Sequence, residues 1–426
     1  MNNKIIIILT IFSVFKVLAQ PNSQNTPVDD DALQLNTITT SVPFLQITPD
    51  SRSGAMGDAG TALSASSASL FWNTSMLSFS EENNEIGISY SPWLSSLAND
   101  ISLSYLSGYK KIDNRNTIGG SLRYFSLGEI VFTDDQGDVT RNHTPTEFEI
   151  LGGYAFKLNE RFALGVNGKF VFSNLTAGIS VGGAETKAGI GGAADVSFTY
   201  YNPEVNYGGT RGKYAFGMTV NNIGNKISYT SLEDRDFMPT NLEIGNALTF
   251  DFDKYNSLTW NTDISKLLVP TPAYYEVIDG ETKLVSGKDP NVGVIAGVLQ
   301  SFYDAPGVPT RDNTDNLIMN ADGSYEIVSG SRFKEELSEI MIGTGLEYAY
   351  KDIFSVRTGY FYENRNKGAR QHLTFGVGLK YNVFLIDFSY LTALGTINNP
   401  LNNTLRFSLR FQFGNNSSNT DNVKPE

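Results

Sequence analysis

The most constraining feature of the sequence is its last strand-like segment, residues 404–413, which reads TLRFSLRFQF. Successive side chains of a β-strand face opposite sides, so this pattern gives the segment one apolar face and one face with two arginines and a glutamine. A soluble β-sandwich would bury the apolar face and would rarely need two arginines opposite it. A membrane barrel turns its apolar face to lipid and its polar face to the lumen. The segment therefore predicts a transmembrane β-barrel.

The first twenty residues predict export. A short basic start ends at Lys4, residues 5–15 are almost wholly apolar, and Val17-Leu18-Ala19 forms a cleavage site of the A-x-A kind. The apolar run is too short to span a bilayer, which needs about 20 residues. We therefore expect a secretory signal peptide over residues 1–19. The chain has no cysteine, which excludes a lipid anchor on cysteine, disulfides, thiolate metal sites and thiol catalysis.

Composition argues against nucleic acid as a partner and is compatible with a barrel. The formal net charge is −13, whereas nucleic-acid-binding proteins carry basic patches. After the signal peptide, no apolar run approaches the length of a transmembrane helix. Because only alternate residues of a barrel strand meet lipid, a mean hydropathy of −0.19 does not argue against a membrane protein of this kind.

Strand signals recur along the chain, and about fourteen can be counted. Their centres are Ile88, Leu103, Leu122, Ile150, Val166, Val196, Phe216, Ile244, Trp260, Leu346, Val356, Phe375, Ile386 and Phe407. The connections between them alternate between long and short in almost every pair; for example, residues 126–143 form a long connection and residues 157–160 a tight one. We therefore predict an all-β fold, an antiparallel transmembrane β-barrel of about 14 strands over residues 81–413.

The alternation of the connections also predicts an orientation. Outer-membrane barrels have short turns on the periplasmic side and long loops outside the cell. An even strand count then places both termini in the periplasm of a Gram-negative cell, with a polar C-terminal tail at 414–426. A secreted soluble β-propeller or sandwich is the alternative fold. It would need a buried core, whereas the polar residues within these strands are often charged and the apolar ones often aromatic.

The segment ahead of the barrel, residues 20–80, is expected to form a periplasmic tail up to about Asn36 and then an N-terminal plug. Gly54, Gly57 and Gly60 do not form a nucleotide-binding loop, because the G-x-G-x-x-G spacing, the P-loop lysine and the βαβ context are all missing. We interpret these glycines as positions of close backbone packing inside the lumen.

The insertion at residues 266–339 is the most individual part of the chain, and the order of the loops places it outside the cell. Residues 291–302 predict a helix, and residues 332–339 a second short one. Apolar residues fall at helical spacing in the first, and they are the candidate residues for binding cargo or a partner protein: Val292, Ile295, Val298, Leu299 and Phe302. The first helix is expected to cap the barrel mouth with its apolar face or to dock a partner, since binding often resides on ordered loops of a rigid scaffold, and the two roles are compatible.

Five charged residues of the predicted strands are expected to face the lumen: Arg123, Glu147, Lys169, Arg406 and Arg410. We expect them to form an internal network of salt bridges that fills the barrel. An ion-selective pore is the other possibility, and the plug would obstruct it.

The sequence contains few residues or motifs that are typical of catalysis or metal binding. His143 and His372 are the only histidines, and no serine motif of the nucleophile-elbow type occurs. Residues 134–138 read DDQGD and resemble a fragment of a calcium loop, but the full spacing and the closing glutamate are missing. We therefore expect neither an enzyme nor a cofactor or metal site, and we interpret residues 134–138 as an acidic solvated turn.

A family resemblance is carried by residues 51–77, SRSGAMGDAGTALSASSASLFWNTSML, which lead into about fourteen strands. This arrangement resembles the FadL-type outer-membrane barrels, in which the region folds into the lumen as a plug, or hatch. The usual Asn-Pro-Ala of that family is Asn73-Thr74-Ser75 here, which departs from its pattern. Within this group the chain resembles the PorV family, also called LptO. The matching stretches are VPFLQITPDSRSGAMGDAG at 42–60, SFYDAPG at 301–307, GYFYENRNKGARQ at 359–371 and LIDFSYL at 385–391.

The resemblance implies a role in the type IX secretion system. Members of the family are understood to receive cargo proteins from a large outer-membrane translocon channel, to bind their C-terminal signal domains and to carry them to a cell-surface attachment complex with a sortase-type peptidase. The implied partners are that channel, the cargo signal domains, the attachment complex and outer-membrane lipid. A FadL-like channel for hydrophobic small molecules is the alternative function, and it rests on fold analogy alone.

Overall fold

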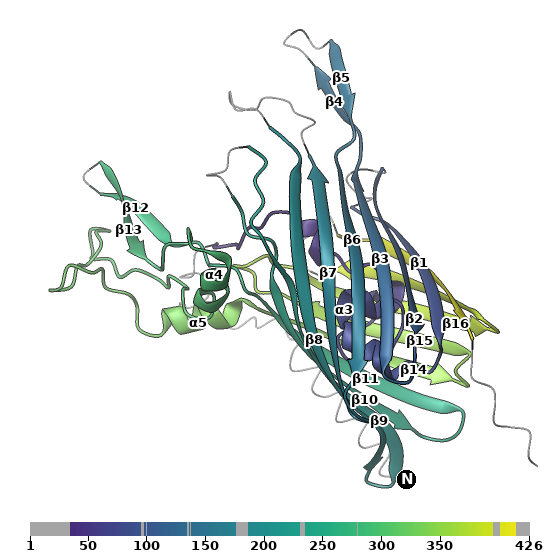
Figure 1. Cartoon of the computed structure of the whole chain (residues 1–426). Helices are drawn as coiled ribbons and strands as arrows, with labels where there is room; N and C mark the ends of the chain where they lie inside the picture. The colour runs from purple at the N-terminus through teal and green to yellow at the C-terminus, as the bar shows by residue number, and fades with distance from the viewer. Residues whose placement is uncertain are drawn as a thin grey trace, which may run out of the picture. The chain divides into compact units, whose positions relative to one another are not determined.

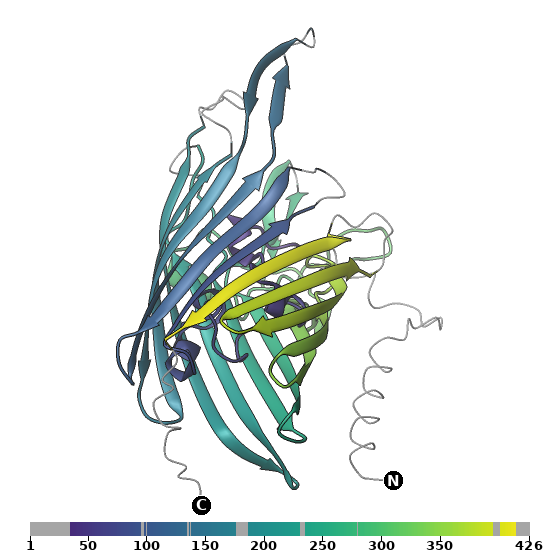
Figure 2. The same ribbon diagram turned by 90° about the vertical axis from the view of Figure 1, so that its right-hand side faces the viewer.

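The computed structural model describes residues 35–414 except 95–97, 99, 134–135, 137, 176–185, 231–234, 279 and 395–400. Fourteen strands form one closed barrel (Figure 1, Figure 2). They are β1 (Asn84–Pro92), β2 (Ile101–Lys111), β3 (Asn116–Leu127), β6 (Thr146–Lys157), β7 (Phe162–Asn174), β8 (Gly189–Tyr207), β9 (Thr210–Gly224), β10 (Asn241–Asp251), β11 (Asn256–Leu267), β14 (Ile340–Tyr350), β15 (Phe354–Tyr362), β16 (Gln371–Tyr381), β17 (Phe384–Ala393) and β18 (Thr404–Phe413). The predicted signal peptide, residues 20–34, most of the acidic turn at 134–138 and the tail from residue 415 lie outside the described residues.

The predicted fold class is confirmed, because all fourteen predicted strand centres fall inside these fourteen strands. Neighbouring strands are antiparallel, and the barrel closes where β1 pairs with β18, with Ser89 opposite Ser408. Closure leaves no unpaired strand edge, which a bilayer could not satisfy with hydrogen bonds. Within the part of the chain that the structure describes, no helix is long and apolar enough to span a membrane.

Two short hairpins outside the barrel are not predicted by the sequence analysis. β4 (Ile130–Thr133) pairs with β5 (Val139–His143), and β12 (Tyr274–Ile278) pairs with β13 (Glu281–Ser286). Their arms are so short that alternation of side chains cannot be recognised in them. The connection between β11 and β14 also contains α4 (Val294–Gln300) and α5 (Ser331–Ser338), which match the two predicted helices with shorter or shifted ends.

The strands turn apolar side chains outward and polar side chains inward. In β18, Phe407 and Phe413 are nearly half exposed, while Arg406 and Ser408 are buried. The same alternation runs through most of the other barrel strands; in β7, for example, Val166 is exposed and Asn167 is buried. β2 differs, because its Leu103 and Tyr105 face inward and are buried. A soluble protein buries its apolar face, so this inverted pattern is the one expected of strands that face lipid.

The connections sort by length onto the two ends of the barrel. Short turns follow β2, β6, β8, β10, β14 and β16, and we call this side the short-turn end. Longer connections follow β1, β3, β7, β9, β11, β15 and β17, and they define the long-loop end. The insertion between β11 and β14, which holds α4 and α5, therefore belongs to the long-loop end, as expected from the sequence.

An N-terminal segment, residues 35–83, runs through the interior of the barrel (Figure 1, purple). It forms short helical turns at η1 (Pro43–Gln46), α2 (Ser51–Gly54), α3 (Ser69–Trp72) and η2 (Thr74–Phe79). The Asp50 side chain caps α2 by accepting a hydrogen bond from Ser53 N at 2.9 Å, and its other oxygen accepts from Trp72 Nε1, also at 2.9 Å. One carboxylate thus ties two turns of the segment together.

The segment touches strands on all sides of the lumen. Ser51 N donates to Ser408 Oγ in β18 at 2.9 Å. The amides of Gly60 and Thr61 both donate to Asp263 Oδ2 in β11, at 2.7 and 2.8 Å. Ser75 N donates to Ser197 Oγ in β8 at 3.1 Å. Backbone amides that would otherwise be buried without partners are satisfied by the barrel wall in this way.

The three glycines of the segment lie where the sequence interpretation expects close packing. A Cβ added at Gly54 would lie 2.5 Å from Arg406 Nη1, and one at Gly60 would lie 2.5 Å from the Trp72 ring. Gly57 has a φ of +77° and lies directly against backbone oxygens of Thr344 and Tyr360. Only glycine fits such a close approach to the barrel wall.

Of the predicted periplasmic tail, residues 20–36, the structure describes only Leu35 and Asn36. In the structure Asn36 N donates to Asn366 O at 3.0 Å, in the connection between β15 and β16 at the long-loop end. The strand count determines the positions of β1 and β18, but it carries no information about how the chain reaches β1.

An ionic ladder lines one half of the lumen. Arg52 of the segment pairs with Glu347 of β14 at 2.7 Å, and Glu347 pairs with Arg357 of β15 at 2.5 Å. Arg357 reaches Asp387 of β17 at 2.7 Å. Asp387 pairs with Arg410 of β18 at 2.9 Å, and Arg410 lies 3.8 Å from Glu85 of β1. The ladder crosses β16 at Gly378, whose missing side chain leaves room for the Arg357–Asp387 pair.

Gly378→Ala is expected to destabilise the barrel by about 1–3 kcal/mol, because overpacking forces neighbouring groups apart. The added Cβ would lie 2.6 Å from Asp387 Oδ1 and 2.7 Å from Arg357 Nη1. The midpoint of urea unfolding of the detergent-solubilised protein measures the change. Gly168→Ala in β7 is the matched control, since its Cβ would meet no atom within 4 Å. Equal urea midpoints for the two variants would show that the ionic ladder accommodates the added methyl group without loss of stability.

Candidate functional site

Arg123 of β3 joins the barrel wall to the N-terminal segment. Its guanidinium donates to Leu45 O at 3.1 Å and forms an ion pair with Glu149 of β6 at 2.6 Å. The guanidinium carbon also lies 4.8 Å from the centre of the Phe71 ring, within range of a cation–π interaction. The side chain is fully buried. Arg123 therefore acts as a fixed contact between the wall and the segment.

Lys169 and Glu147 also face inward, with different partners. Lys169 Nζ pairs with Asp195 at 2.9 Å and donates to Asn222 Oδ1 at 2.8 Å. Asp195 lies at a β-bulge between β8 and β9, and it also accepts a hydrogen bond from Asn222 N at 2.7 Å. Glu147 accepts from Ser173 Oγ at 2.7 Å. The lysine thus stabilises the irregular pairing of two strands.

Arg406 holds a turn of the N-terminal segment. Its Nη1 lies 3.1 Å from Asp58 Oδ1, and the ring Nε2 of His372 lies 3.0 Å from the other Asp58 oxygen. The His372 ring stacks on Phe361 with 5.0 Å between ring centres. Arg410 belongs to the ionic ladder. The five residues that the sequence assigns to the lumen therefore all contact other residues of the chain, in an arrangement that supports an internal network over an open ion pathway.

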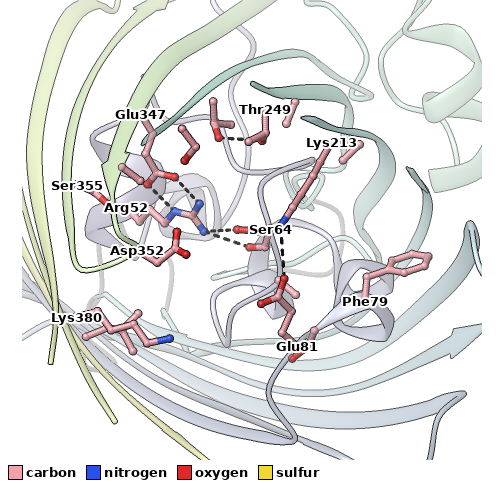
Figure 3. Close-up of a pocket in the computed structure, with 18 of the residues that line it drawn as sticks. Arg52, Ser64, Phe79, Glu81, Lys213, Thr249, Glu347, Asp352, Ser355 and Lys380 are labelled. Atoms are coloured by element: carbon pink, nitrogen blue, oxygen red, sulfur yellow. Dashed lines mark hydrogen bonds and ion pairs between the residues drawn. The ribbon is translucent and has the colours of Figure 1, made fainter. Parts of the chain in front are cut away.

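A polar cavity of about 400 Å³ opens inside the short-turn end (Figure 3). Arg52 and Glu347 line it as a mostly buried pair, and the more exposed Lys213 and Glu81 also line it, 3.6 Å apart. Asp352 and Lys380 also line it. Because charges of both signs are interspersed around the cavity, it offers no concentrated field for an anion or a cation.

The long-loop half of the lumen is filled by apolar side chains of the N-terminal segment itself. Val42, Phe44 and Leu45 are almost completely buried, and they pack against strand residues such as Leu103 and Phe125. The Phe44 and Phe125 rings are stacked 6.3 Å apart. An apolar ligand entering from this end would have to displace these side chains.

Ion pairs fasten the insertion to the long-loop end of the barrel. Lys367, in the connection between β15 and β16, lies 2.9 Å from Glu335 and 3.0 Å from Glu339. Lys266, at the end of β11, lies 3.2 Å from Glu336 and also contacts Glu339. These lysines and glutamates are mostly buried. Together with the buried Asp304 they form a group that we call the insertion base: Lys266, Asp304, Glu335, Glu336, Glu339 and Lys367.

Two of the stretches that carry the family resemblance meet at the insertion base. Residues 301–307 follow α4 directly. In this stretch Ala305 N donates to Glu336 Oε1 at 2.9 Å, and Gly307 N donates to Glu335 Oε2 at 2.8 Å. Residues 359–371 contribute Lys367. The sequence shows these stretches as separate matches. The structure shows that both serve to position the insertion on the barrel.

Asp304 is a buried carboxyl within the insertion base. Its Oδ2 accepts a hydrogen bond from Thr271 N at 3.1 Å, while its Oδ1 has no hydrogen-bond partner among the described residues. Burial raises the pKa of Asp304 to about 6, and the nearby negative charges of Glu339 and Glu336 act in the same direction.

Helix α4 docks through its glycine and not through its apolar face. Gly297 is buried, and a Cβ there would lie 2.7 Å from the Phe237 ring and 3.1 Å from Pro270. Ile295, Leu299 and Phe302 are 66%, 61% and 49% exposed. The expectation that the apolar face caps the barrel mouth is therefore wrong, because the smooth side at Gly297 allows the closer contact. Val292 and Val298, the other two candidate residues, are half-buried.

Helix α5 presents apolar side chains in the same manner. Phe333 and Leu337 are 69% and 51% exposed, four residues apart on one side of the helix. Glu335, on another side, is buried in the insertion base. The sequence analysis predicts this helix but does not include Phe333 and Leu337 among the candidate binding residues. Their spacing of four residues could have identified them as neighbours on one side of the helix.

Within the described residues, no group of three or more histidine, aspartate and glutamate side chains could hold a metal ion. His143 lies in the β4–β5 hairpin, and His372 is held between Asp58 and Phe361. The features left as candidates for function are the two exposed apolar helix faces on a base fixed by ion pairs.

Lys367→Met is expected to loosen the insertion, because it leaves the buried Glu335 carboxylate without a cation and leaves Glu339 with Lys266 alone. Breaking a buried pair in this way costs about 3–5 kcal/mol. Limited proteolysis of the detergent-solubilised protein should then cut residues 268–339 faster than in the parent. Arg365→Met in the same connection is the matched control, since Arg365 is exposed. Unchanged cleavage of the lysine variant would show that other contacts hold the insertion.

Asp304→Asn is expected to remove a pH dependence of the insertion base. The carboxyl titrates near 3.8 when unfolded and near 6 when folded. Between these values the folded state binds the extra proton, so stability falls as the pH rises from about 4 to 6. Hydrogen exchange of residues 301–339, corrected for intrinsic rates, should show this loss of protection in the parent and not in the variant. Identical pH profiles would refute the assignment.

Solved structures resemble the chain at low sequence identity. The Pseudomonas putida toluene transporter TodX has 11% identity and a TM-score of 0.44, over 89% of this chain and 98% of that one. The Ralstonia pickettii toluene transporter TbuX has 12% identity and a TM-score of 0.44, over 86% and 98%. A Pseudomonas aeruginosa FadL homologue has 10% identity and a TM-score of 0.38, over 89% and 100%.

Sequence comparison gives a more specific result. No curated protein matches the chain. A family model described as the type IX secretion system protein PorV matches residues 30–274, more than half of the chain. The matched region contains the whole N-terminal segment seen in the lumen and the barrel strands from β1 to β11. The chain therefore belongs to the family of the type IX secretion system protein PorV.

Proposed function

We propose that this barrel is a non-enzymatic adaptor, which binds secreted cargo after translocation and hands it to an attachment complex on the cell surface. The family and the barrel fold assign it to the outer membrane and to type IX secretion. The binding of cargo signal domains, the transfer to a sortase-type complex and the contact with a large translocon channel are the proposed steps.

The observation that carries the proposal is the exposed apolar face of α4. Ile295 and Leu299 lie one helical turn apart, and both are more than half exposed on a helix that is fixed to the barrel through Gly297. Large apolar side chains exposed together on a rigid base are typical of a protein-binding surface. We call Ile295, Leu299 and Phe302 the docking face.

The rigid base supports a binding function over a mobile-loop function. The insertion is held by buried ion pairs from β11 and from the connection between β15 and β16. A preformed surface loses little conformational entropy when a partner binds, which favours affinity. The orientation expected for a barrel with short periplasmic turns puts this surface outside the cell. There it would meet cargo after translocation.

A channel for hydrophobic small molecules remains the alternative function. Apolar side chains of the N-terminal segment occupy the long-loop half of the lumen, and the cavity at the short-turn end is lined by charges. Both features count against a continuous apolar path. Unchanged fatty-acid uptake in a strain that lacks the protein would exclude the channel.

The double variant Ile295→Asp/Leu299→Asp is expected to lose partner binding while the barrel stays folded. Two carboxylates on the docking face would have to be desolvated on contact, which should weaken the complex by tenfold or more. Pull-down of the detergent-solubilised protein, with quantification of cargo and translocon subunits, measures the loss. Surface attachment of cargo in cells gives the second measurement.

Val277→Asp is the matched control, because Val277 is 68% exposed in β12 of the same insertion and lies outside the docking face. It should bind as the parent does. Normal recovery of cargo and translocon with the double variant would sink the proposal for this surface. Equal losses in both variants would mean that added charge, and not the docking face, is responsible.

A further inference from the structure

A polar groove lies within the insertion, apart from the docking face. It has a volume of about 470 Å³ and runs between the end of β13 and the loop at residues 320–327, and Arg332 of α5 also lines it. Among the described residues that line the groove, Arg332 is the only charged one. The groove therefore favours a ligand that brings a negative charge.

The guanidinium of Arg332 is positioned at the groove without an ion pair. Its Nη2 donates to Ser286 Oγ at 3.4 Å, and its Cγ lies 2.9 Å from the place of a Cβ at Gly307, so the stem packs against that glycine. Within the part of the chain that the structure describes, no carboxylate pairs with this guanidinium, whereas Arg311 of the same insertion pairs with Glu276 at 2.8 Å. An arginine held in this way can bind a carboxylate through two parallel hydrogen bonds.

The loop on the other side of the groove presents a free strand edge. In this loop Glu326 makes the backbone hydrogen bonds: its N donates to Ile318 O and its O accepts from Thr310 N, both at 2.8 Å. Successive residues of a strand point their backbone groups to opposite sides. The N–H and C=O groups of Tyr325 and Ile327 therefore point the other way, and among the described residues they have no hydrogen-bond partner. Tyr325 and Ile327 line the groove, and Glu326 does not.

A free edge of this kind pairs with an extended peptide. Unpaired N–H and C=O groups on an edge are a template for an added strand, which forms backbone hydrogen bonds with them. Backbone pairing gives affinity with little dependence on sequence, and Arg332 adds a preference for an acidic side chain. One ligand satisfies both features, namely an extended protein segment that carries an aspartate or a glutamate.

The groove is joined to the docking face by a short, fixed stretch of chain. Gly307, which packs against Arg332, follows Phe302 of the docking face by five residues, which reach at most about 18 Å. Ser286 at the groove donates to Pro306 O in this stretch. A small domain is about 30 Å across, so a single bound domain is large enough to contact both the docking face and the groove.

We propose that this groove binds an extended acidic segment of the cargo protein, which adds as a strand along residues 325–327 and places its carboxylate on Arg332. The inference rests on the proposed function, because it takes the cargo as the partner. It goes beyond that function by naming the backbone edge and the charge that recognise the cargo. The docking face supplies apolar contact, and the groove determines which segment is bound and in which direction.

Two variants test the edge and the charge separately. Arg332→Gln removes the charge, and Ile327→Pro removes a backbone donor at a strand edge, where proline is tolerated. With the purified signal domain of the recovered cargo, Arg332→Gln should raise the Kd about tenfold and Ile327→Pro about fivefold, as expected for a charged and a neutral hydrogen bond. Arg365→Gln is the matched control, since Arg365 is exposed in the connection between β15 and β16. It should bind as the parent does.

A cross-link identifies the bound segment. Because the chain has no cysteine, Ser324→Cys in the groove can be labelled with a benzophenone maleimide, and Val277→Cys serves as the position outside the groove. Light should join the Ser324 variant, and not the Val277 variant, to an extended segment of the signal domain that contains an aspartate or a glutamate. Replacing that acidic residue by arginine should weaken binding to the parent and restore binding to Arg332→Glu to within about threefold of the original pair.

The outcomes separate this inference from the proposed function. Parent-like binding by Arg332→Gln and Ile327→Pro, with cargo lost by the docking-face variant, would overturn the groove proposal and leave the proposed function standing. Parent-like binding by all three variants would overturn both. Cross-links to a helical or basic segment, or a charge swap that fails to restore binding, would also refute the groove proposal.

Discussion

The pairing of charges inside the barrel is the condition on which the rest of the structure depends. An unpaired charge buried in a packed lumen costs several kcal/mol, so each inward lysine or arginine needs a fixed partner. The ionic ladder runs from Arg52 through β14, β15, β17 and β18 to Glu85 of β1. One set of pairs therefore fixes the register of several strands, spans the closing seam and holds the N-terminal segment. The same strands carry apolar side chains on the outward face and these paired charges on the inward face.

The strands could be predicted from the sequence because outward positions of a membrane barrel face lipid, which favours an apolar residue at every second position. Apolar side chains recur with period two on the outward face of most strands, although β2 turns Leu103 and Tyr105 inward, and all fourteen predicted centres fall inside strands. The partners of the inward charges could not be predicted. Arg123 donates to Leu45 O, 78 residues away, and Arg406 pairs with Asp58, far from it in sequence. Such pairs depend on how the segment threads the lumen, which no local pattern records.

In the insertion, the helix could be predicted from the sequence, but the side of the helix that is buried could not. Helical spacing of apolar residues predicts α4 correctly, but it does not determine which side of the helix is buried. Amphipathic patterning assumes that the apolar side faces the protein. Here Gly297 makes the contact with Phe237 and Pro270, and the apolar side chains remain exposed. The exposed apolar side chains of this helix are the basis of the proposed partner-binding role.

The thread of residues 36–80 through a closed ring has a consequence for how the molecule is made. A ring closed without the segment would leave Arg406 of β18 without the Asp58 carboxylate and Glu347 of β14 without Arg52. Because unpaired buried charges are costly, we expect the sheet to close around the segment while β1 and β18 are still apart. The contacts of Ser51 and Ser89 with Ser408 would then form as the seam closes. In this chain we therefore expect the pairing of β1 with β18 to be the last step of folding, after the N-terminal segment is in place.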